Sequence, residues 1–333
     1  MAGTATALKK RADRPRSGRE ERLAKSQRTI ADAVDIEGVG LHSGAPVRLR
    51  ILPAEPDAGI SFVRRDLGGI TIPAAHRYLQ DSSYATTLGR DSALVATVEH
   101  LLSALHGVGI DNAIIEVDGS EIPILDGSAL PFVEAIHAAG RRRQRARRRY
   151  LGLQKPISIR RGDRTILALP SNELRITYAI DFPHSAIGYQ VWSARLDRSS
   201  FAAAIAPART FCLLRDVEAM QKAGLALGGS LDNAVVVGDD GVLNESLRFP
   251  DEFVRHKVLD LIGDLALLGM PLRAHVIAFK GGHGTHAELV GALLASRGAW
   301  TLRSSDERLP QEQLARFAHL TEHVLPRQPA LSV

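Results

Sequence analysis

Apolar residues recur every three or four positions between residues 252 and 268, the spacing of a helix with one face in a hydrophobic core. The opposite stripe of this predicted helix carries His256, Asp260 and Asp264, each four residues from the next. Residues four apart on a helix project the same way, so His256 and Asp260 can reach one ion. The pair could equally be an ordinary surface pair that stabilises the helix by about 0.2 to 0.5 kcal/mol.

A second helix is predicted near residues 97–107, with Thr97 as N-cap and two glycines at its end. Its first turn contains Glu99 and His100. Neighbouring helical residues point about 100° apart, so one of the two is expected to bind a metal while the other stands beside the bound water. The helix dipole also favours an acid in the first turn, which explains Glu99 without chemistry.

Shorter apolar runs predict strands in both halves of the chain, at 46–51, 113–117, within 157–182 and at 273–279. Further helices are predicted near 128–139 and 286–296. The stretch 207–233 is apolar and partly helical. Strands mixed with helices in each half indicate an α+β fold.

The last predicted strand runs into a glycine-rich turn, Lys-Gly-Gly-His-Gly-Thr-His at 280–286, with His283 at its centre. This turn has neither the Gly-Lys-Ser/Thr ending of a phosphate loop nor the spacing of a dinucleotide fingerprint. The chain also lacks HExxH, so nothing supports an ordinary zinc protease. Two histidines at a loop tip could simply be solvated.

These segments supply histidines and carboxylates but no thiolate. Two histidines and an aspartate suit an open zinc site, in which the fourth position is left for water, whereas a closed structural site normally uses four ligands with cysteine among them. The pattern therefore indicates hydrolysis. Cys212 is the single cysteine, which excludes an intramolecular disulfide.

The net charge of +5 over 333 residues is concentrated in two segments. Residues 1–28 hold nine Lys or Arg against three Asp or Glu, and residues 141–149 hold seven arginines. The remainder of the chain is therefore acidic. Both runs can be explained as solvated, unstructured segments. The more specific hypothesis is that they contact acidic lipid headgroups. Neither run has the interleaved aromatics or motif of a nucleic-acid binder.

Seven short sequence motifs, which occur in this order along the chain, resemble those of a known family. They are Val39-Gly-Leu-His-Ser-Gly44, Thr97-Val-Glu-His-Leu101, Gly109-Ile-Asp-Asn112, Glu121-Ile-Pro-Ile-Leu-Asp-Gly-Ser128, Ala208-Arg-Thr-Phe211, Leu227-Gly-Gly-Ser230 and Asp251-Glu-Phe-Val-Arg-His-Lys257. The chain closely resembles the LpxC family, the UDP-3-O-acyl-N-acetylglucosamine deacetylases of lipid A biosynthesis. The resemblance runs from about Arg28 to beyond Trp300.

The resemblance implies a role for each candidate residue. His100, His256 and Asp260 match the zinc ligands; Glu99 matches the general base, His283 the general acid and Asp264 the carboxylate that orients it; Lys257, Thr210 and Phe211 match residues around the substrate, with Thr210 near the developing oxyanion and Phe211 against the sugar. A scheme in which Glu99 alone handles both proton transfers stays open.

The resemblance also implies two similar two-layer α/β sandwich domains with the metal at their junction. The predicted division is a basic, disordered leader at 1–27, a first domain at 28–140, an Arg-rich linker at 141–150, a second domain at 151–325 with a hydrophobic-passage insertion near 207–233, and a tail at 326–333.

The implied activity is hydrolysis of the N-acetyl group of UDP-3-O-(3-hydroxyacyl)-N-acetylglucosamine, with one Zn²⁺ per chain and Fe²⁺ as the alternative ion. We expect a cytoplasmic monomer of a Gram-negative bacterium, with peripheral contact with the inner membrane and no nucleic-acid partner. A zinc amidohydrolase with another substrate and a non-catalytic lipid or nucleic-acid binder are the competing hypotheses.

Three departures from the family pattern stand out. The usual Lys-Ser-Gly-His-Ala-Leu-Asn reads here Lys-Gly-Gly-His-Gly-Thr-His, so His286 replaces an asparagine and the turn is richer in glycine. The segment at 182–187 lacks the proline often found after its histidine, and the leader is longer than usual.

Overall fold

The computed structural model describes residues 25–325. The first half of the chain builds a five-stranded sheet in the order β2-β3-β9-β4-β5. Its strands are β2 (Val34–Val39), β3 (Pro46–Pro53), β4 (Ile60–Arg64), β5 (Ile70–Pro73) and β9 (Ala113–Val117). Side chains of β3 alternate between exposed and buried, as expected when one face of a sheet covers the core. The strands predicted at 46–51 and 113–117 are confirmed.

Helices α2 (Glu99–Val108) and α3 (Leu130–Ala138) belong to the same half. A small sheet of β6 (Leu79–Asp81), β7 (Thr87–Arg90) and β8 (Ala93–Val95), with the 3₁₀ turns η2 (Arg65–Leu67) and η3 (His76–Tyr78), completes it. Thr97 was wrongly predicted as the N-cap of α2. Val98 occupies that position, while Thr97 has a φ of 58° and donates its hydroxyl hydrogen bond to Glu121.

The second half forms a seven-stranded sheet centred on β19 (Leu272–Phe279). Its other strands are β11 (Tyr150–Leu153), β12 (Ile157–Arg161), β13 (Arg164–Pro170), β14 (Arg175–Asp181), β15 (Tyr189–Arg195) and β20 (Trp300–Arg303). The main path is β12-β13-β19-β11-β20, and β14 pairs with both β15 and β19. The strands predicted within 157–182 and at 273–279 are confirmed.

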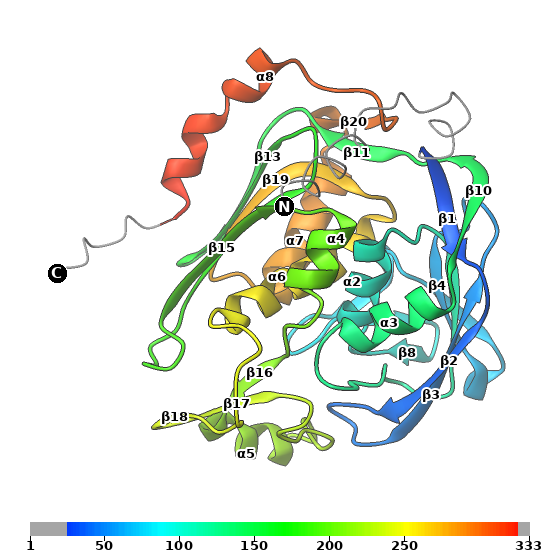
Figure 1. Ribbon diagram of the computed structural model, residues 1–333, viewed down its shortest axis with the longest axis vertical. Coiled ribbons are helices and arrows are strands. Elements are labelled where there is room, and N and C mark those ends of the chain that lie inside the picture. Colours follow the sequence, from blue (N-terminus) through cyan, green and yellow to red (C-terminus); the bar gives the residue numbers. More distant parts are fainter. Residues whose placement is uncertain (1–24, 326–333) are drawn as a thin grey trace, which may run out of the picture.

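The long helix α6 (Glu252–Leu265), extended by η4 (Ala266–Leu268), packs beside α2 between the two sheets (Figure 1). Glycine at 263 permits this close contact, because a Cβ there would lie 2.1 Å from the Glu99 carbonyl oxygen. The other helical elements of this half are α4 (Arg198–Ala204), α7 (His283–Ala295), η5 (Arg297–Ala299), α8 (Gln311–Ala315) and η6 (Ala318–His323). Helix α7 begins three residues before the predicted 286–296.

The apolar stretch at 207–233 leads into a separate small lobe, seen at the bottom of Figure 1. It comprises β16 (Phe211–Leu213), α5 (Leu214–Lys222), β17 (Val235–Gly238) and β18 (Gly241–Val242), and its three strands form their own sheet. The partly helical character predicted for this stretch is confirmed.

The prediction that residues 141–150 form a linker was wrong for most of this segment. Residues 141–147 form strand β10 (Arg141–Arg147), which pairs antiparallel with β1 (Ser26–Ile30). The arginines at 141–143, 145 and 147 are exposed while Gln144 is buried, so this charged run forms a strand with a single buried side chain. The predicted leader also extended too far, because Ser26 and Gln27 belong to β1 and are buried. Its first 24 residues, and the predicted tail at 326–333, lie outside the described residues.

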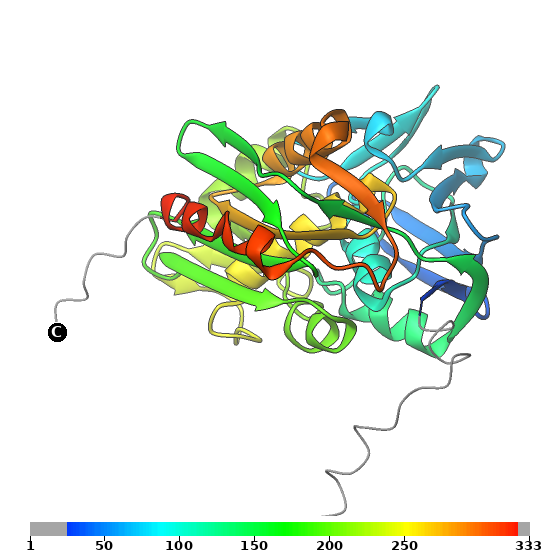
Figure 2. The same ribbon diagram turned by 90° about the horizontal axis from the view of Figure 1, so that it is seen from above.

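One large hydrophobic cluster joins the helices to the inner faces of both main sheets. A smaller one lies on the outer face of the second sheet, where Leu167, Leu169 and Ile277 contact residues after α8, including Phe317 and Leu320. Figure 2 shows the C-terminal helical segment in red along this face. Within residues 25–325, no helix combines the length and apolar character needed to cross a membrane.

Candidate metal centre and substrate cavity

Helix α6 presents three polar side chains on one face, at successive turns. His256, Asp260 and Asp264 are all buried, with exposed fractions of 2–3%. His256 Nε2 lies 3.3 Å from Asp260 Oδ1. Desolvation opposes ionisation of Asp260, but His256 and Lys257 outweigh it and hold the pKa of this carboxyl well below its usual range. The predicted stripe therefore faces the interior and not solvent.

Helix α2 brings His100 to the same place from the other half of the chain. Its Nε2 lies 3.7 Å from Asp260 Oδ1, and its ring stands edge-on to that of His256 at 5.0 Å between centroids. Burial lowers the pKa of His100 to about 3, and the nearby His256 lowers it further as the second-largest cause. This imidazole is therefore neutral. Neutral imidazole is the form that coordinates metals.

His100, His256 and Asp260 fit a metal ion. One ligand atom from each lies within 4.8 Å of the others. Asp260 Oδ1 is buried without a hydrogen-bond partner among the described residues. A buried ionised oxygen without a donor is costly, and a cation between it and two neutral imidazoles would satisfy it. Nitrogen and oxygen donors of this kind suit zinc and ferrous iron.

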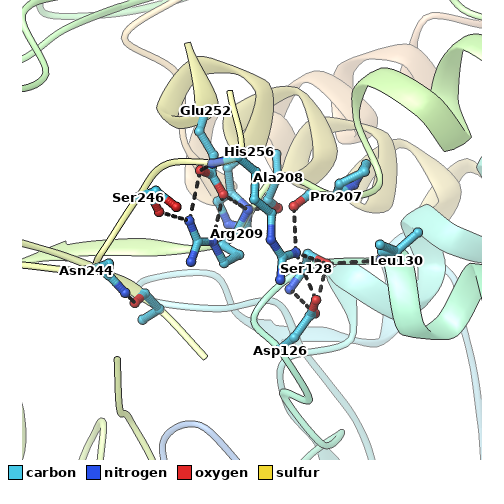
Figure 3. Close-up of polar contacts among 12 residues, drawn as sticks. Asp126, Ser128, Leu130, Pro207, Ala208, Arg209, Asn244, Ser246, Glu252 and His256 are labelled. Carbon is cyan, nitrogen blue, oxygen red and sulfur yellow. Dashed lines mark hydrogen bonds and ion pairs between the residues drawn. The ribbon is translucent and has the colours of Figure 1, made fainter. Parts of the chain in front are cut away.

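The imidazole of His256 is oriented by the loop before β16. Its Nδ1 lies 3.1 Å from the carbonyl oxygen of Ala208, which fixes the ring so that Nε2 faces Asp260. That loop is held by a buried ion pair, in which Arg209 donates to both carboxylate oxygens of Glu252 at 2.9 and 3.1 Å (Figure 3). Arg248 donates to the Pro207 carbonyl oxygen of the same loop at 2.9 Å and to Asp126 of the first half at 2.8 Å.

Glu99, the first residue of α2, lies beside the cluster. Its Oε2 accepts a hydrogen bond from the Thr86 backbone at 3.0 Å, and its Oε1 is 3.8 Å from His283 Nε2. Burial raises the pKa of Glu99 to about 7; His283 opposes this rise and the carboxylates of Asp264 and Asp260 add to it. A carboxyl that titrates near neutral pH can take up and release a proton.

His283 is the first residue of α7 and not part of a loose turn. Gly282 occupies the N-cap position, and the Thr285 hydroxyl accepts a hydrogen bond from its backbone at 3.0 Å. The imidazole Nδ1 donates to Asp264 Oδ2 at 2.8 Å. Burial alone would lower the pKa of His283, but Asp264 and Asp260 outweigh it and raise the pKa to about 9. The imidazole is thus cationic at neutral pH.

Two groups that the sequence did not single out as functional contact Asp264, and a third contacts one of these two. Thr86 donates its hydroxyl to Oδ1 at 2.5 Å, and His286 Nδ1 donates to Oδ2 at 2.7 Å. His286 Nε2 then receives the Tyr178 hydroxyl at 2.9 Å. Asp264, His283 and His286 also form a compact donor group, but both Nδ1 atoms are already bonded to the carboxylate. The exchange of Asn for His286 was the one signal available in the sequence.

A cavity of about 860 Å³ extends from the metal cluster into the small lobe. Its polar end is lined by Glu99, His100, His256, Asp260, His283, Thr210 and Lys257. Lys257 donates to Asp260 Oδ2 at 2.8 Å, and Phe211 packs edge-on against Phe253 at 5.0 Å. Leu213, Leu214, Val217, Met220, Leu231 and Val236 line the other end. All the predicted site residues therefore lie in or beside one cavity, with Asp264 directly behind His283.

The comparisons with known proteins agree with the motifs. The model of the family described as LpxC, UDP-3-O-acyl N-acetylglycosamine deacetylase, matches residues 27–295. The UDP-3-O-acyl-N-acetylglucosamine deacetylase of Anaeromyxobacter dehalogenans (strain 2CP-C) is 50% identical over 275 residues, which cover 82% of this chain and 89% of that protein. The protein of the same name from Myxococcus xanthus (strain DK1622) is 47% identical over 279 residues, covering 83% and 89%. That of Geobacter sp. (strain M21) is 46% identical over 278 residues, covering 83% and 91%. With its metal-binding motifs assembled in one cavity and its relatives matched over most of their length, this chain belongs to the LpxC family.

Proposed function

We propose that this protein hydrolyses the N-acetyl group of UDP-3-O-(3-hydroxyacyl)-N-acetylglucosamine, releasing acetate and the free 2-amine. The observation that carries the proposal is the single cavity that joins a His-His-Asp cluster, a carboxyl and an imidazole to an apolar passage. A polar reacting end and an apolar far end match a sugar nucleotide that carries an acyl chain. The relatives named above bear this activity in their names.

His100, His256 and Asp260 would hold one Zn²⁺, with Fe²⁺ as the alternative. A divalent ion bound there supplies Lewis acidity, which polarises a carbonyl and makes water a better nucleophile near neutral pH. The two neutral imidazoles and one carboxylate leave a net positive charge on the site. That charge would draw the acetamide oxygen toward the cluster.

Glu99 is suited to act as general base. Its pKa of about 7 lets it accept a proton from the attacking water while remaining largely ionised just above neutral pH. The Thr86 backbone N–H fixes one carboxylate oxygen and leaves the other toward His283. The carboxylate is thus oriented before substrate arrives.

His283 is suited to act as general acid. Breaking the amide C–N bond requires a proton on the leaving nitrogen, and Nε2 of the cationic imidazole carries one on the side that faces the cavity. Asp264 holds the opposite ring nitrogen, which maintains both the orientation and the charge. Glu99 acting alone in both transfers is the competing scheme, in which Glu99 would have to pass on to the leaving nitrogen the proton that it has taken from the water.

Thr210, Lys257 and Phe211 are proposed to position the substrate. Thr210 lies at the cavity wall with its backbone fixed to Gly127 at 2.8 Å, where its hydroxyl can approach the developing oxyanion. Lys257 offers a cation for the phosphates, and Phe211 presents a ring face to the sugar. The acyl chain would occupy the apolar passage at the small lobe.

The deciding experiment is a deacetylation assay on UDP-3-O-(3-hydroxyacyl)-N-acetylglucosamine with metal analysis of the same sample. We expect about one divalent ion per chain, and loss of turnover on chelation that is restored by Zn²⁺ or Fe²⁺. Full activity in a metal-free sample would refute the mechanism. Activity confined to simple acetamides would favour the amidohydrolase with another substrate.

A further inference from the structure

A second cavity, of about 670 Å³, lies at the opposite end of α2 from the metal cluster. Helix α2 has ten residues, so its two ends are separated by roughly 15 Å. The two cavities share no lining residue. Five arginines line the second one: Arg141 and Arg148 from the Arg-rich run at 141–149, and Arg198, Arg273 and Arg308 from later segments.

The acids around this cavity are already engaged. Asp197 accepts two backbone hydrogen bonds as the N-cap of α4, and Glu173 pairs with Arg195 at 3.3 Å. Asp111 lies behind the wall, where it binds Arg148 at 2.6 Å and accepts the backbone N–H of Arg28 at 2.8 Å. The arginines therefore outnumber the carboxylates that could neutralise them.

Some of these arginines hold the walls in place. Arg273 donates to the carbonyl oxygens of Ser304, Ser305 and Glu307, and its guanidinium stacks on Tyr150 at 4.1 Å. Such contacts fix the shape of the cavity before any ligand enters, which lowers the entropic cost of binding.

Arg198 has no such partner. Within residues 25–325 the side chain of Arg198 makes no hydrogen bond or ion pair, and its guanidinium lies across Gly109, where a Cβ would stand 2.7 Å from Nε. Close behind it, Arg28 is only 6% exposed and its Nη1 is buried without an acceptor among the described residues. Burial, and then the charges of Arg198 and Arg148, lower the pKa of Arg28 to about 10. Like charges with unused donors are costly unless an anion joins them.

We propose that this arginine-lined cavity binds a phosphate monoester, either on a small metabolite or as a lipid headgroup. The planar guanidinium matches phosphate oxygens with two parallel hydrogen bonds, and several arginines around one pocket give the charge that a dianion requires. Arg198, with the free donors of Arg148 and Arg141, supplies the contacts. The cavity is a site separate from the one that handles the substrate.

The test uses the intact, metal-loaded chain with glycerol 3-phosphate as soluble probe and vesicles containing phosphatidic acid as lipid probe. Arg198→Gln removes the central contact. Arg142→Gln is the matched control, because Arg142 is exposed on β10, carries the same charge and does not line the cavity. Binding is measured by calorimetry and by vesicle co-sedimentation.

We expect saturable binding of at least one probe, weakened tenfold or more by Arg198→Gln and unchanged by Arg142→Gln. Preference for glycerol 3-phosphate would identify a free metabolite, and preference for vesicles a headgroup. Without probe, Arg198→Gln should unfold no earlier than wild type, since it removes an uncompensated charge, and both variants should keep normal deacetylation. Equal weakening by both variants, no saturation with either probe at about 10 mM phosphate, or loss of binding with Lys257→Ala instead would each overturn the proposal.

Discussion

At the scale of single residues, the proposed mechanism depends on two titrating groups, Glu99 and His283, whose nearest side-chain atoms lie 3.8 Å apart. Glu99 is a buried carboxyl whose pKa is raised, and His283 is a buried imidazole whose pKa is raised by carboxylates. The raised pKa makes the Glu99 carboxylate a stronger base, and the raised pKa of His283 keeps its imidazole charged at neutral pH. Environments that prepare neighbouring groups for different proton transfers are typical of acid–base catalysis.

Substitutions separate these roles from metal binding. Glu99→Gln and His283→Ala should each lower kcat by about 10²- to 10⁴-fold while metal content stays near one ion per chain. His256→Ala should instead lower metal affinity, because it removes a ligand. Kinetics and metal analysis on the same preparations check both statements. Near-normal turnover of His283→Ala would leave the scheme with Glu99 alone.

The pH profile follows from the direction of each shift. Activity should rise with pH as Glu99 loses its proton near its pKa of about 7, and fall as His283 loses its proton near its pKa of about 9. A bound cation lowers the pKa of both groups, so each limb of the bell lies below these values. The profile of kcat/KM between pH 5 and 10 measures it. In Glu99→Gln the acid limb should vanish, and its persistence would assign that limb to another group.

His286 should be needed for a well-held Asp264. Replacing it by Ala leaves the buried Tyr178 hydroxyl and one Asp264 oxygen with a lost partner, which should reduce the free energy of unfolding by about 1 to 3 kcal/mol. His286→Asn restores a donor of suitable length and should recover part of both stability and kcat. Urea unfolding and steady-state kinetics test this. If His286→Ala matched wild type in stability and in kcat, the hydrogen bonds of His286 would contribute to neither.

At the scale of elements, α6 could be predicted from sequence because a buried helix with one polar stripe has a strong period. Strand β10 could not be predicted, since five exposed arginines flank the single buried residue, Gln144, and leave no apolar period along the strand. The geometry of His283 was also out of reach. Only tertiary packing shows that Gly282 caps α7 and that His286 turns inward to Asp264. The helix spacing alone left the set of metal ligands open, and the prediction of this set depended on the family motifs.

The contact between α2 and α6 sets the distance between the two sources of metal ligands. Gly263→Ala would place a methyl group 2.1 Å from the Glu99 carbonyl oxygen, and backbone cannot yield as a side chain can. We expect a loss of about 1 to 3 kcal/mol in stability and weaker metal binding, because His100 moves away from His256 and Asp260. Gly298→Ala is the control, since a Cβ there meets nothing within 4 Å. Equal metal affinity in both variants would show that the helices can separate without harm to the site.

At the scale of the whole molecule, the metal cluster joins the two halves of the chain. His100 comes from the half that contains the five-stranded sheet, and His256 and Asp260 come from the half that contains the seven-stranded sheet. The Arg248–Asp126 ion pair and the shared hydrophobic cluster hold the halves together beside the site. The division into two domains therefore remains a proposal about architecture, while the two halves share one core. A bound metal should raise the unfolding temperature of the whole molecule.

The N-terminal boundary gives a final prediction at this scale. Gln27 lies in β1, where its side chain donates to Asp57 at 2.6 Å and accepts from Asn112 at 2.9 Å, so a chain that starts at residue 28 loses buried hydrogen bonds. We expect that chain to be less stable by about 1 to 3 kcal/mol. A chain that starts at residue 25 keeps all of these contacts and should match the full chain in folding and in turnover of a soluble short-chain substrate.

Residues 1–24 hold seven Lys or Arg against three Asp or Glu. Their removal should weaken the binding of the protein to anionic vesicles. The lost binding should be sensitive to salt, because such attraction is screened within about 8 Å at physiological ionic strength. Thermal unfolding, turnover and co-sedimentation of the three lengths decide the matter, and loss of turnover in the chain that starts at residue 25 would mean that the leader packs against the catalytic halves.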